Sequence, residues 1–383
     1  MFKNYEIEQY KTIKDKFMSQ YDKLNKTHNI LVMVGNGFDI ACLNNFRSKQ
    51  FPNLVSSYSN FYQYLELQGR ILKDNYIYKQ MSLDKNKNKE NWSDFENSIA
   101  TLYCDVDIDN VQLTKDLDDI RNEFSYYLNE LIDYDIVKAL NNDSSENKRA
   151  SITLSSFLFD VDGECGAFNC SVDHGDLINF KFLNFNYTFL LDNYLCLDKR
   201  QFDPHKYSVS DRNLSFHTLT GFWGNEWIPS AYLMLKVEHP NGVQHIPRSY
   251  IFGTEAENYP KWCDDKFLIK SFVGQYDRKY FDYFDNVEVF IIFGMSLGAS
   301  DSWWYKNIFH TIMKNQSHLL IYFYGKDISA DEIKNKFIHS AVTDLSLYSE
   351  FDLEDIKRSI SVVIYDDDSK IKFLSFHNND FQE

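Results

Sequence analysis

The sequence predicts an α/β protein with a Rossmann-like, doubly wound, mostly parallel sheet and a large helical insertion. Three observations lead to this prediction. Residues 30–34 form an unbroken apolar run, which is typical of a strand buried on both faces. In the second half of the chain, strand-like runs, glycine turns and helical segments alternate as in parallel βαβ units. Between these parts lies a long region with helical periodicity and no clear strand.

The expected elements follow in chain order. Residues 4–25 space their apolar side chains at steps of two to four, which predicts an amphipathic helix. The strand at 30–34 leads into a helix that begins near Phe38. The remaining helices are expected at 58–65, 92–103, 113–140, 189–197, 302–314 and 330–339. The remaining strands are expected at 180–185, 213–219, 249–252, 287–293, 318–324 and 359–365.

This order of elements suggests a division of the chain into three parts. Residues 1–54 would hold the N-terminal helix and the first βα unit of the Rossmann-like domain. Residues 55–150 would form the helical insertion or cap, and residues 151–383 would complete the domain.

Composition limits the classes of function. The chain has 383 residues, 44% of them apolar, which predicts a globular fold. Its formal net charge of −16 disfavours nucleic-acid binding. Cys165 and Cys170 are close, but no second pair completes a zinc site, so no metal is expected. A polar N-terminus without the apolar core of a signal peptide, and the absence of any 18-residue apolar run, predict a cytoplasmic protein that does not enter a membrane.

The turn after the first strand is the clearest sign of chemistry. Gly35 and Gly37 flank Asn36, and neither glycine has a Cβ to keep a ligand from the backbone. A helix that begins here would aim N–H groups at a phosphate. Ile40 occupies the place of the third glycine in G-x-G-x-x-G, so the dinucleotide motif is incomplete. A tight turn that binds nothing is the competing interpretation.

Gly35, Asn186 and Gly294 all follow predicted strands. Ligands of doubly wound sheets bind at the carboxyl ends of the strands. The three positions are therefore expected to meet at one binding crevice.

Four stretches carry a resemblance to a known family: Val34-Gly35-Asn36-Gly37-Phe38-Asp39 with Tyr58 and Phe61, Trp92-Ser93-Asp94-Phe95-Glu96, Phe185-Asn186-Tyr187-Thr188, and Phe293-Gly294-Met295-Ser296-Leu297-Gly298 with Asp301. In these stretches the sequence resembles the AbiH family of bacterial abortive-infection proteins, which act in defence against bacteriophage. Their order and wide spacing cover most of the chain.

AbiH proteins are in turn similar to the sirtuin-like NAD-binding fold, which implies roles for residues of the matching stretches. Asn186 would face the nicotinamide ribose, and the turn from Gly294 to Ser296 would approach the adenosine half. Tyr187 and Asp301 would complete the cofactor site. The phosphates would be held by Gly35, Asn36, Gly37 and Phe38.

The sequence departs from the family at the expected His-Gly segment. Here it reads Val-Glu-His-Pro-Asn-Gly, with Asn241 directly before Gly242. His239 would serve as the catalytic histidine, with His217 and His245 as rivals. Without such a histidine, the site would bind a nucleotide and not consume it.

Cleavage of the nicotinamide bond of NAD passes through a cationic sugar, by analogy with glycoside hydrolysis. Asn186 would hold a hydroxyl or the attacking water, His239 would accept a proton, and Asp39 would stabilise the developing cation. Each has a plain structural alternative. Asn186 is a common turn former, Asp39 suits a first helical turn, and His239 would be an ordinary loop residue.

Two further patterns are weaker. Asp94 and Glu96 are spaced i, i+2, which places them on different faces of a helix and disfavours a paired acid and base. The segment from Gly294 to Gly298 matches G-x-S-x-G, which would make Ser296 a hydrolase nucleophile. That interpretation leaves the first glycine turn and the Asn186 segment unexplained.

Two main hypotheses follow. In the first, the protein is an anti-phage abortive-infection effector that binds NAD and, once triggered, hydrolyses it to nicotinamide and ADP-ribose. In the second, it is a non-catalytic nucleotide-binding sensor or partner module of a defence system. A nuclease or hydrolase-type toxin is a lesser alternative. The expected partners are a small-molecule nucleotide, a phage-derived trigger or partner protein, and a second copy of the chain in a homo-oligomer.

Overall fold

The computed structural model describes residues 27–47, 54–70, 74–87, 107–146, 157–161, 177–195, 232–255, 268–369 and 371–376, with residues 96, 99, 102, 103, 105, 153, 154 and 266. The helix expected at 4–25, the strand expected at 213–219 and His217 lie outside the described residues.

A six-stranded sheet forms the centre of the protein, with strand order β3-β2-β1-β4-β5-β6. All five neighbouring pairs are parallel. This order is that of a doubly wound Rossmann-like sheet. From β1 the chain adds β2 and β3 on one side, and it then adds β4, β5 and β6 on the other side, so the strand order reverses between β1 and β4. The predicted fold class is confirmed. The strands are β1 (Thr27–Val34), β2 (Leu177–Asn184), β3 (Tyr232–Glu238), β4 (Val287–Phe293), β5 (His318–Tyr324) and β6 (Ile360–Tyr365).

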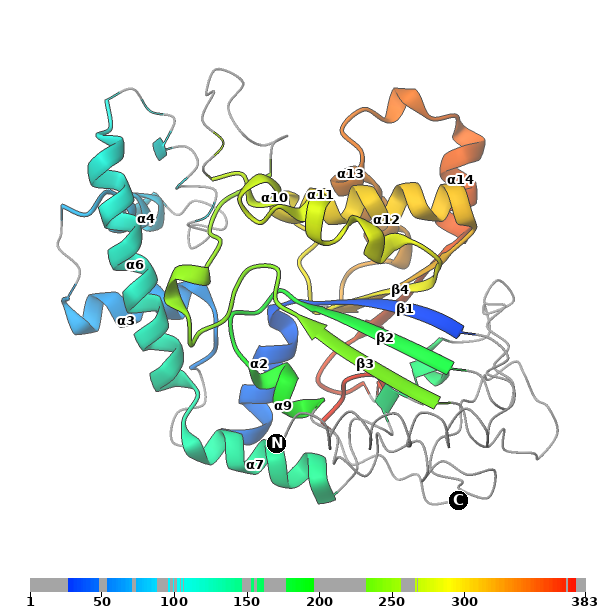
Figure 1. Ribbon diagram of the computed structural model, residues 1–383, viewed down its shortest axis with the longest axis horizontal. Helices are drawn as coiled ribbons and strands as arrows, with labels where there is room; N and C mark the ends of the chain where they lie inside the picture. The colour runs from blue at the N-terminus through cyan, green and yellow to red at the C-terminus, as the bar shows by residue number, and fades with distance from the viewer. Residues whose placement is uncertain are drawn as a thin grey trace, which may run out of the picture.

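Helices cover both faces of the sheet, as Figure 1 shows, with α12, α13 and α14 on one face and α2, α7 and α9 on the other. The helices are α2 (Asn36–Phe46), α3 (Tyr58–Gln68), α4 (Tyr76–Asn86), α6 (Asn110–Leu131), α7 (Tyr134–Glu146), α9 (Leu190–Tyr194), α10 (Lys270–Val273), α11 (Tyr276–Lys279), α12 (Ser302–Asn315), α13 (Ala330–Ala341) and α14 (Glu350–Arg358). Short 3₁₀ turns occur at η1 (Phe157–Asp160), η4 (Pro247–Ser249), η6 (Phe281–Phe284), η7 (Ala299–Asp301) and η8 (Leu345–Leu347).

The central strand β1 explains why the core has two halves. Ile30, Val32 and Val34 point into the cluster under α2. Leu31 and Met33 point into the cluster under α12 and α13. Successive side chains of a strand alternate between faces, so a strand covered on both sides must be apolar throughout.

The helical region between β1 and β2 stands beyond the carboxyl ends of the strands, where α3, α4 and α6 lie in Figure 1. The long helix expected at 113–140 is two helices, α6 and α7. Asp133 separates them, and its side chain accepts a hydrogen bond from the N–H of Ile136, as an N-cap does.

The prediction of a strand at 249–252 is wrong. This segment follows the 3₁₀ turn η4, and the N–H of Ile251 donates to the carbonyl of Asn241 in a loop. The edge strand is β3 instead, which the sequence analysis missed. Lys236 and Glu238 interrupt its apolar pattern, as an outer strand with a wet face allows. Across the described residues, no helix combines the length and the apolar character needed to cross a bilayer.

Candidate functional site

The turns that follow β1, β2 and β4 meet at the carboxyl edge of the sheet, where the strand order reverses. The N–H of Gly35 donates to the carbonyl of Phe293 at 2.9 Å, and the N–H of Gly37 to that of Gly294 at 2.9 Å. The side-chain amide of Asn186 donates to the carbonyl of Gly35 at 3.1 Å. The three positions therefore meet, as expected from strand ends that share one edge.

The two glycine turns pack directly on each other. A Cβ built on Gly37 would lie 2.6 Å from the Cα of Gly294, so any side chain would collide with backbone. Gly294 itself has a φ of 65°, which an L side chain rarely adopts. The close approach that these glycines permit is thus first an approach of one turn to the other.

This packing uses N–H groups that a phosphate would otherwise contact. Gly37 donates to Gly294, and the N–H of Phe38 donates to the carbonyl of Gly35. The side chain of Asn36 is also engaged, because its Nδ2 donates to the Ser56 carbonyl at 3.1 Å and its Oδ1 accepts from the Ser56 hydroxyl at 2.5 Å. A ligand at this turn has fewer donors than an open glycine-rich loop offers.

Asp39 lies below the turn in the first turn of α2 and is 1% exposed. Its Oδ2 accepts a hydrogen bond from the Thr188 hydroxyl at 2.7 Å. Its Oδ1 is buried and has no hydrogen-bond partner among the described residues. Burial raises the pKa of Asp39 from 3.8 to about 7, although the hydrogen bond from Thr188 lowers it in part. A carboxyl group in this range can gain or lose a proton near neutral pH.

His239 directly follows β3, and its Nε2 lies 3.1 Å from both carboxylate oxygens of Asp192 in α9. Its Nδ1 is buried without a hydrogen-bond partner among the described residues. Asp192 raises the pKa of Asp39 and His239 lowers it, so the charges of these three residues interact. When Nε2 carries the proton that Asp192 accepts, Nδ1 is a basic nitrogen.

A second polar cluster joins five residues from separate segments of the chain. The Nζ of Lys270 lies 2.7 Å from a carboxylate oxygen of Glu96 and 3.9 Å from one of Asp301. The hydroxyls of Tyr58 and Tyr187 donate to the other Glu96 oxygen at 2.9 and 3.1 Å. Glu96 comes from the helical insertion, Lys270 opens α10, and Asp301 ends the turn after β4. We call Glu96, Lys270 and Asp301 the buried charge cluster.

The pKa values of the buried charge cluster follow from burial and mutual attraction. Burial works against the charge on Lys270, but Glu96 and Asp301 outweigh it and hold the Lys270 pKa above its ordinary value. Burial raises the pKa of Asp301, while Lys270 lowers it. A buried pair of this kind costs several kcal/mol of desolvation for each ion, so it adds little net stability. Buried charges beside a ligand-binding edge are typical of functional sites.

Other predicted residues lie at the margin of this site. Ser296 is exposed, while Met295 beside it packs close to Gly35. His245 stacks on Phe189, with ring centroids 4.8 Å apart. His318, one of the histidines that a Ser296 nucleophile could have used, is the first residue of β5 and forms a hydrogen bond with Ser361 at 2.9 Å. It therefore lies at the amino ends of the strands, away from Ser296.

The sequence analysis missed Asp192 and Lys270 as members of the site. Asp192 lies in the first turn of α9, shortly after Asn186, so its place could have drawn attention to it. Lys270 lies outside every motif, and nothing in the sequence indicates that it is buried. Glu96 was considered only as half of a pair with Asp94, which lies outside the described residues.

The fold and this edge define a Rossmann-like α/β protein with buried ionisable groups at the point where ligands of such sheets bind. A family model described as bacteriophage abortive infection AbiH matches residues 31–323, and the chain belongs to this family. The match runs from β1 into β5 and includes both polar clusters. The family supports a role in bacteriophage abortive infection. No curated protein matches the chain.

Proposed function

We propose that the protein binds NAD at the carboxyl edge of the sheet and hydrolyses it to nicotinamide and ADP-ribose when phage infection triggers it. The observation that supports this function most directly is the pairing of Asp39 with His239. Both have a buried polar atom without a hydrogen-bond partner among the described residues. Asp39 lies in the first turn of α2, which follows β1, and His239 follows the outer strand β3, and their charges interact. Unpartnered buried polar atoms cost stability, and binding or catalysis accounts for them.

The reaction adds water across the glycosidic bond of NAD. The bond between the ribose C1′ and the nicotinamide nitrogen breaks, nicotinamide leaves as a neutral molecule, and a water oxygen bonds to C1′. The water proton must go to a base, and the Nδ1 of His239 or the carboxylate of Asp39 can accept it. A carboxylate at Asp39 also stabilises the cationic sugar while the bond breaks.

Asn186 contributes first by positioning. Its Nδ2 holds the Gly35 carbonyl, and its own N–H donates to the Asn184 side chain at 3.1 Å. These bonds fix the first glycine turn against the end of β2. Asn186 therefore holds the first glycine turn in place, and its Oδ1 is the atom that would contact a ribose hydroxyl.

The test is nicotinamide release from NAD by the purified protein, alone and with lysate of phage-infected cells. We expect Asp39→Asn and His239→Ala to lower release by about 100-fold or more, the usual loss of a proton-transfer group. His245→Ala, a histidine held by Phe189 outside the pair, is the matched control and should stay within about threefold. Absence of nicotinamide release under every condition would contradict the hydrolytic proposal.

A second function is favoured by one observation. Asn241 stands directly before Gly242, where the family resemblance implies a histidine, and an amide side chain is not a base, which suits a site that binds a nucleotide without cleaving it. In this version the protein is a nucleotide sensor of a defence system. Calorimetry with NAD and with ADP-ribose distinguishes the two functions, because a sensor would bind one of them without turnover and would keep its affinity in His239→Ala.

A further inference from the structure

Among the described residues, the outer edge of β6 lacks the charges, prolines and covering strand that normally protect a sheet edge. β6 pairs with β5 on one side, and no strand of the described part of the chain pairs with its other side. Its sequence, Ile-Ser-Val-Val-Ile-Tyr, contains no charge and no proline, and Ile364 is 36% exposed. The opposite outer strand, β3, carries the charged pair Lys236 and Glu238. Uncharged, β-branched edges are templates for the addition of another strand.

The hydrogen bonds between β5 and β6 show which backbone groups of β6 point outward. The carbonyls of Ser359 and Tyr365 accept from Leu319 and Gly325, at the two ends of the β5 pairing. Neighbouring residues of a strand direct their N–H and C=O groups to opposite sides. The outward groups therefore belong to Ile360, Val362 and Ile364.

These outward groups suit an antiparallel partner of the same sequence. In a two-fold arrangement centred on Val362, Val362 meets its own copy, and Ile360 of each chain meets Ile364 of the other. Every exposed N–H and C=O of the three residues then finds a partner. Two-fold symmetry requires this kind of self-complementary surface.

Charge at the two ends of β6 favours the same register. Lys357 and Arg358 precede the strand, and Asp366, Asp367 and Asp368 follow it. The register centred on Val362 brings the basic end of each copy to the acidic end of the other. This local complementarity matters because two chains of net charge −16 otherwise repel each other.

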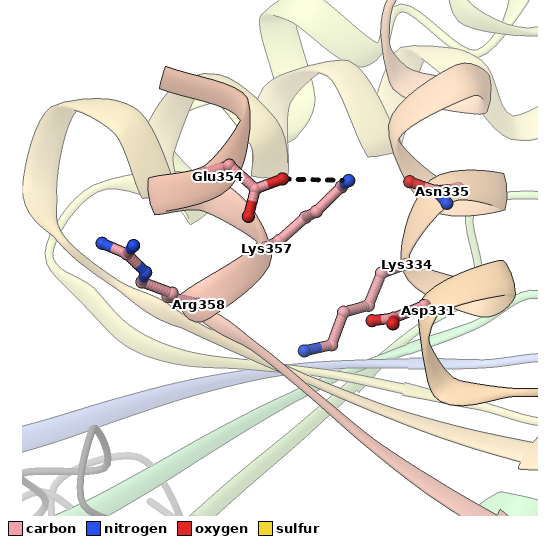
Figure 2. A pocket seen from close by; sticks show the side chains of 6 residues that line it. All are labelled: Asp331, Lys334, Asn335, Glu354, Lys357 and Arg358. Carbon is pink, nitrogen blue, oxygen red and sulfur yellow. Dashed lines mark hydrogen bonds and ion pairs between the residues drawn. The ribbon is translucent and has the colours of Figure 1, made fainter. Parts of the chain in front are cut away.

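A groove at the basic end gives the acidic end a place to bind. It has a volume of about 300 Å³ and lies between α13 and α14, where Figure 2 shows Lys334, Lys357 and Arg358 along its walls. Asp331 and Glu354 also line it, and Glu354 pairs with Lys357 at 3.3 Å. Arg358 pairs with Asp355 at 3.1 Å, whereas no carboxylate of the described residues lies within ion-pair distance of Lys334, so Lys334 is the cation of the groove that can receive an acidic segment.

We propose that β6 pairs antiparallel with β6 of a second copy of this chain, which joins two six-stranded sheets into one. The contact lies away from the carboxyl edge between β1 and β4 and does not depend on the proposed function. Alternating hydrogen-bonded pairs along three apolar residues supply the attraction. The charged ends fix the register and the antiparallel direction.

The test is sedimentation equilibrium of the purified protein and of charge reversals. We expect the wild type to dimerise. Lys357→Glu and Asp367→Lys should each raise the dissociation constant of the dimer about tenfold. A two-fold dimer contains the contact between Lys357 and Asp367 twice, so each substitution changes two contacts. The double variant K357E/D367K should return to within about threefold of the wild type. Lys138→Glu, an equal charge change on α7, is the matched control and should leave the dimer unchanged.

A backbone variant tests the strand pairing itself. Val362→Pro removes an outward N–H and leaves the inward bonds to β5, so it should give a monomer with an unchanged circular dichroism spectrum. A wild type that stays monomeric up to about 100 µM would overturn the proposal. So would a dimer that neither charge reversal weakens. Protection of the Val362 amide from hydrogen exchange in a monomer would assign the edge to another part of the same chain and would overturn it as well.

Discussion

Two regions of the sheet differ in the exposure of their charged side chains. These regions are the carboxyl edge near β1 and β4 and the outer region of β5 and β6. At the carboxyl edge, Asp39, Glu96 and Lys270 are at most 5% exposed. In the outer region, Arg358 and Asp355 pair at 3.1 Å with side chains that are 76% and 75% exposed. The outer region keeps its ions in water at almost no cost. The carboxyl edge bears a desolvation cost for its buried ions, and this difference is one of the observations that support the function proposed for it.

The largest effect is expected from breaking the buried charge cluster. Lys270→Met leaves Glu96 and Asp301 buried without their cation, and this should lower the free energy of unfolding by about 3–5 kcal/mol. The double variant K270M/E96Q removes one of the two carboxylates as well and should recover part of the loss. Urea unfolding measures both. A loss below about 1 kcal/mol in K270M would show that water reaches the cluster and would weaken the contrast between the two regions.

A change at Asp39 should have the opposite sign. The folded protein holds the Asp39 pKa at about 7, above its ordinary value of 3.8, so this carboxyl group binds its proton more tightly when folded. Its contribution to stability is complete below about pH 4 and is lost as the pH rises through 7. Asp39→Asn carries no charge and should be more stable than the wild type at pH 8 by about 2–4 kcal/mol.

The pH dependence is the control for this prediction. At pH 4 the folded Asp39 carries its proton and little more than half of the unfolded groups have lost theirs, so the advantage of Asp39→Asn should shrink to less than about 1 kcal/mol. Urea unfolding at the two pH values gives the comparison. An equal effect at both would mean that the substitution acts through packing or through the Thr188 hydrogen bond.

Substitution of a glycine in the packed turns should change stability less, and the sign of the change shows whether the turns are in contact. In an open helical position, Gly→Ala stabilises by up to about 1 kcal/mol. At Gly37 the added methyl group would lie 2.6 Å from the Cα of Gly294, so Gly37→Ala should instead destabilise by about 1–3 kcal/mol. Gly69 ends α3 with a φ of 60° and open space around its Cβ position, so Gly69→Ala reports the left-handed cost alone, about 1 kcal/mol. Thermal unfolding would separate the two.

The smallest effect belongs to the exposed pair in the outer region. Arg358→Ala removes a contact with Asp355 one helical turn away, and it should change the free energy of unfolding by about 0.5 kcal/mol or less. The measurement belongs at low protein concentration, so that self-association does not contribute. A loss above about 1 kcal/mol would remove the contrast from which the comparison began.

The sequence predicted elements well where apolar patterning was strong. The bounds of β4 and β5 agree with the prediction, because each has at least five consecutive apolar or aromatic residues directly followed by a glycine. The helix α14 was not predicted, although Ser349 and Asp352 form a capping box that marks its start. The strand β3 was missed because its charged residues dilute the same signal. Local patterns report local burial and not the place of a strand in the sheet.

The site followed the same rule. Gly35, Asn186 and Gly294 could be brought together from the sequence, because the ends of parallel strands share one edge. Lys270 and Glu96 could not. They are 174 residues apart and belong to no common pattern, and only the packing of the insertion over the sheet makes them a pair.

By itself, the sequence determined that a parallel sheet forms, that its central strands are buried on both faces, and that glycine turns follow β1 and β4. Those properties depend on neighbouring side chains and need no knowledge of distant contacts. The tertiary structure alone decided that the two turns pack on each other, that Asp39 lies near His239 and Asp192, and that the uncharged strand β6 lies at the edge. Each of these depends on how far-apart segments share one volume, which local physical chemistry does not specify.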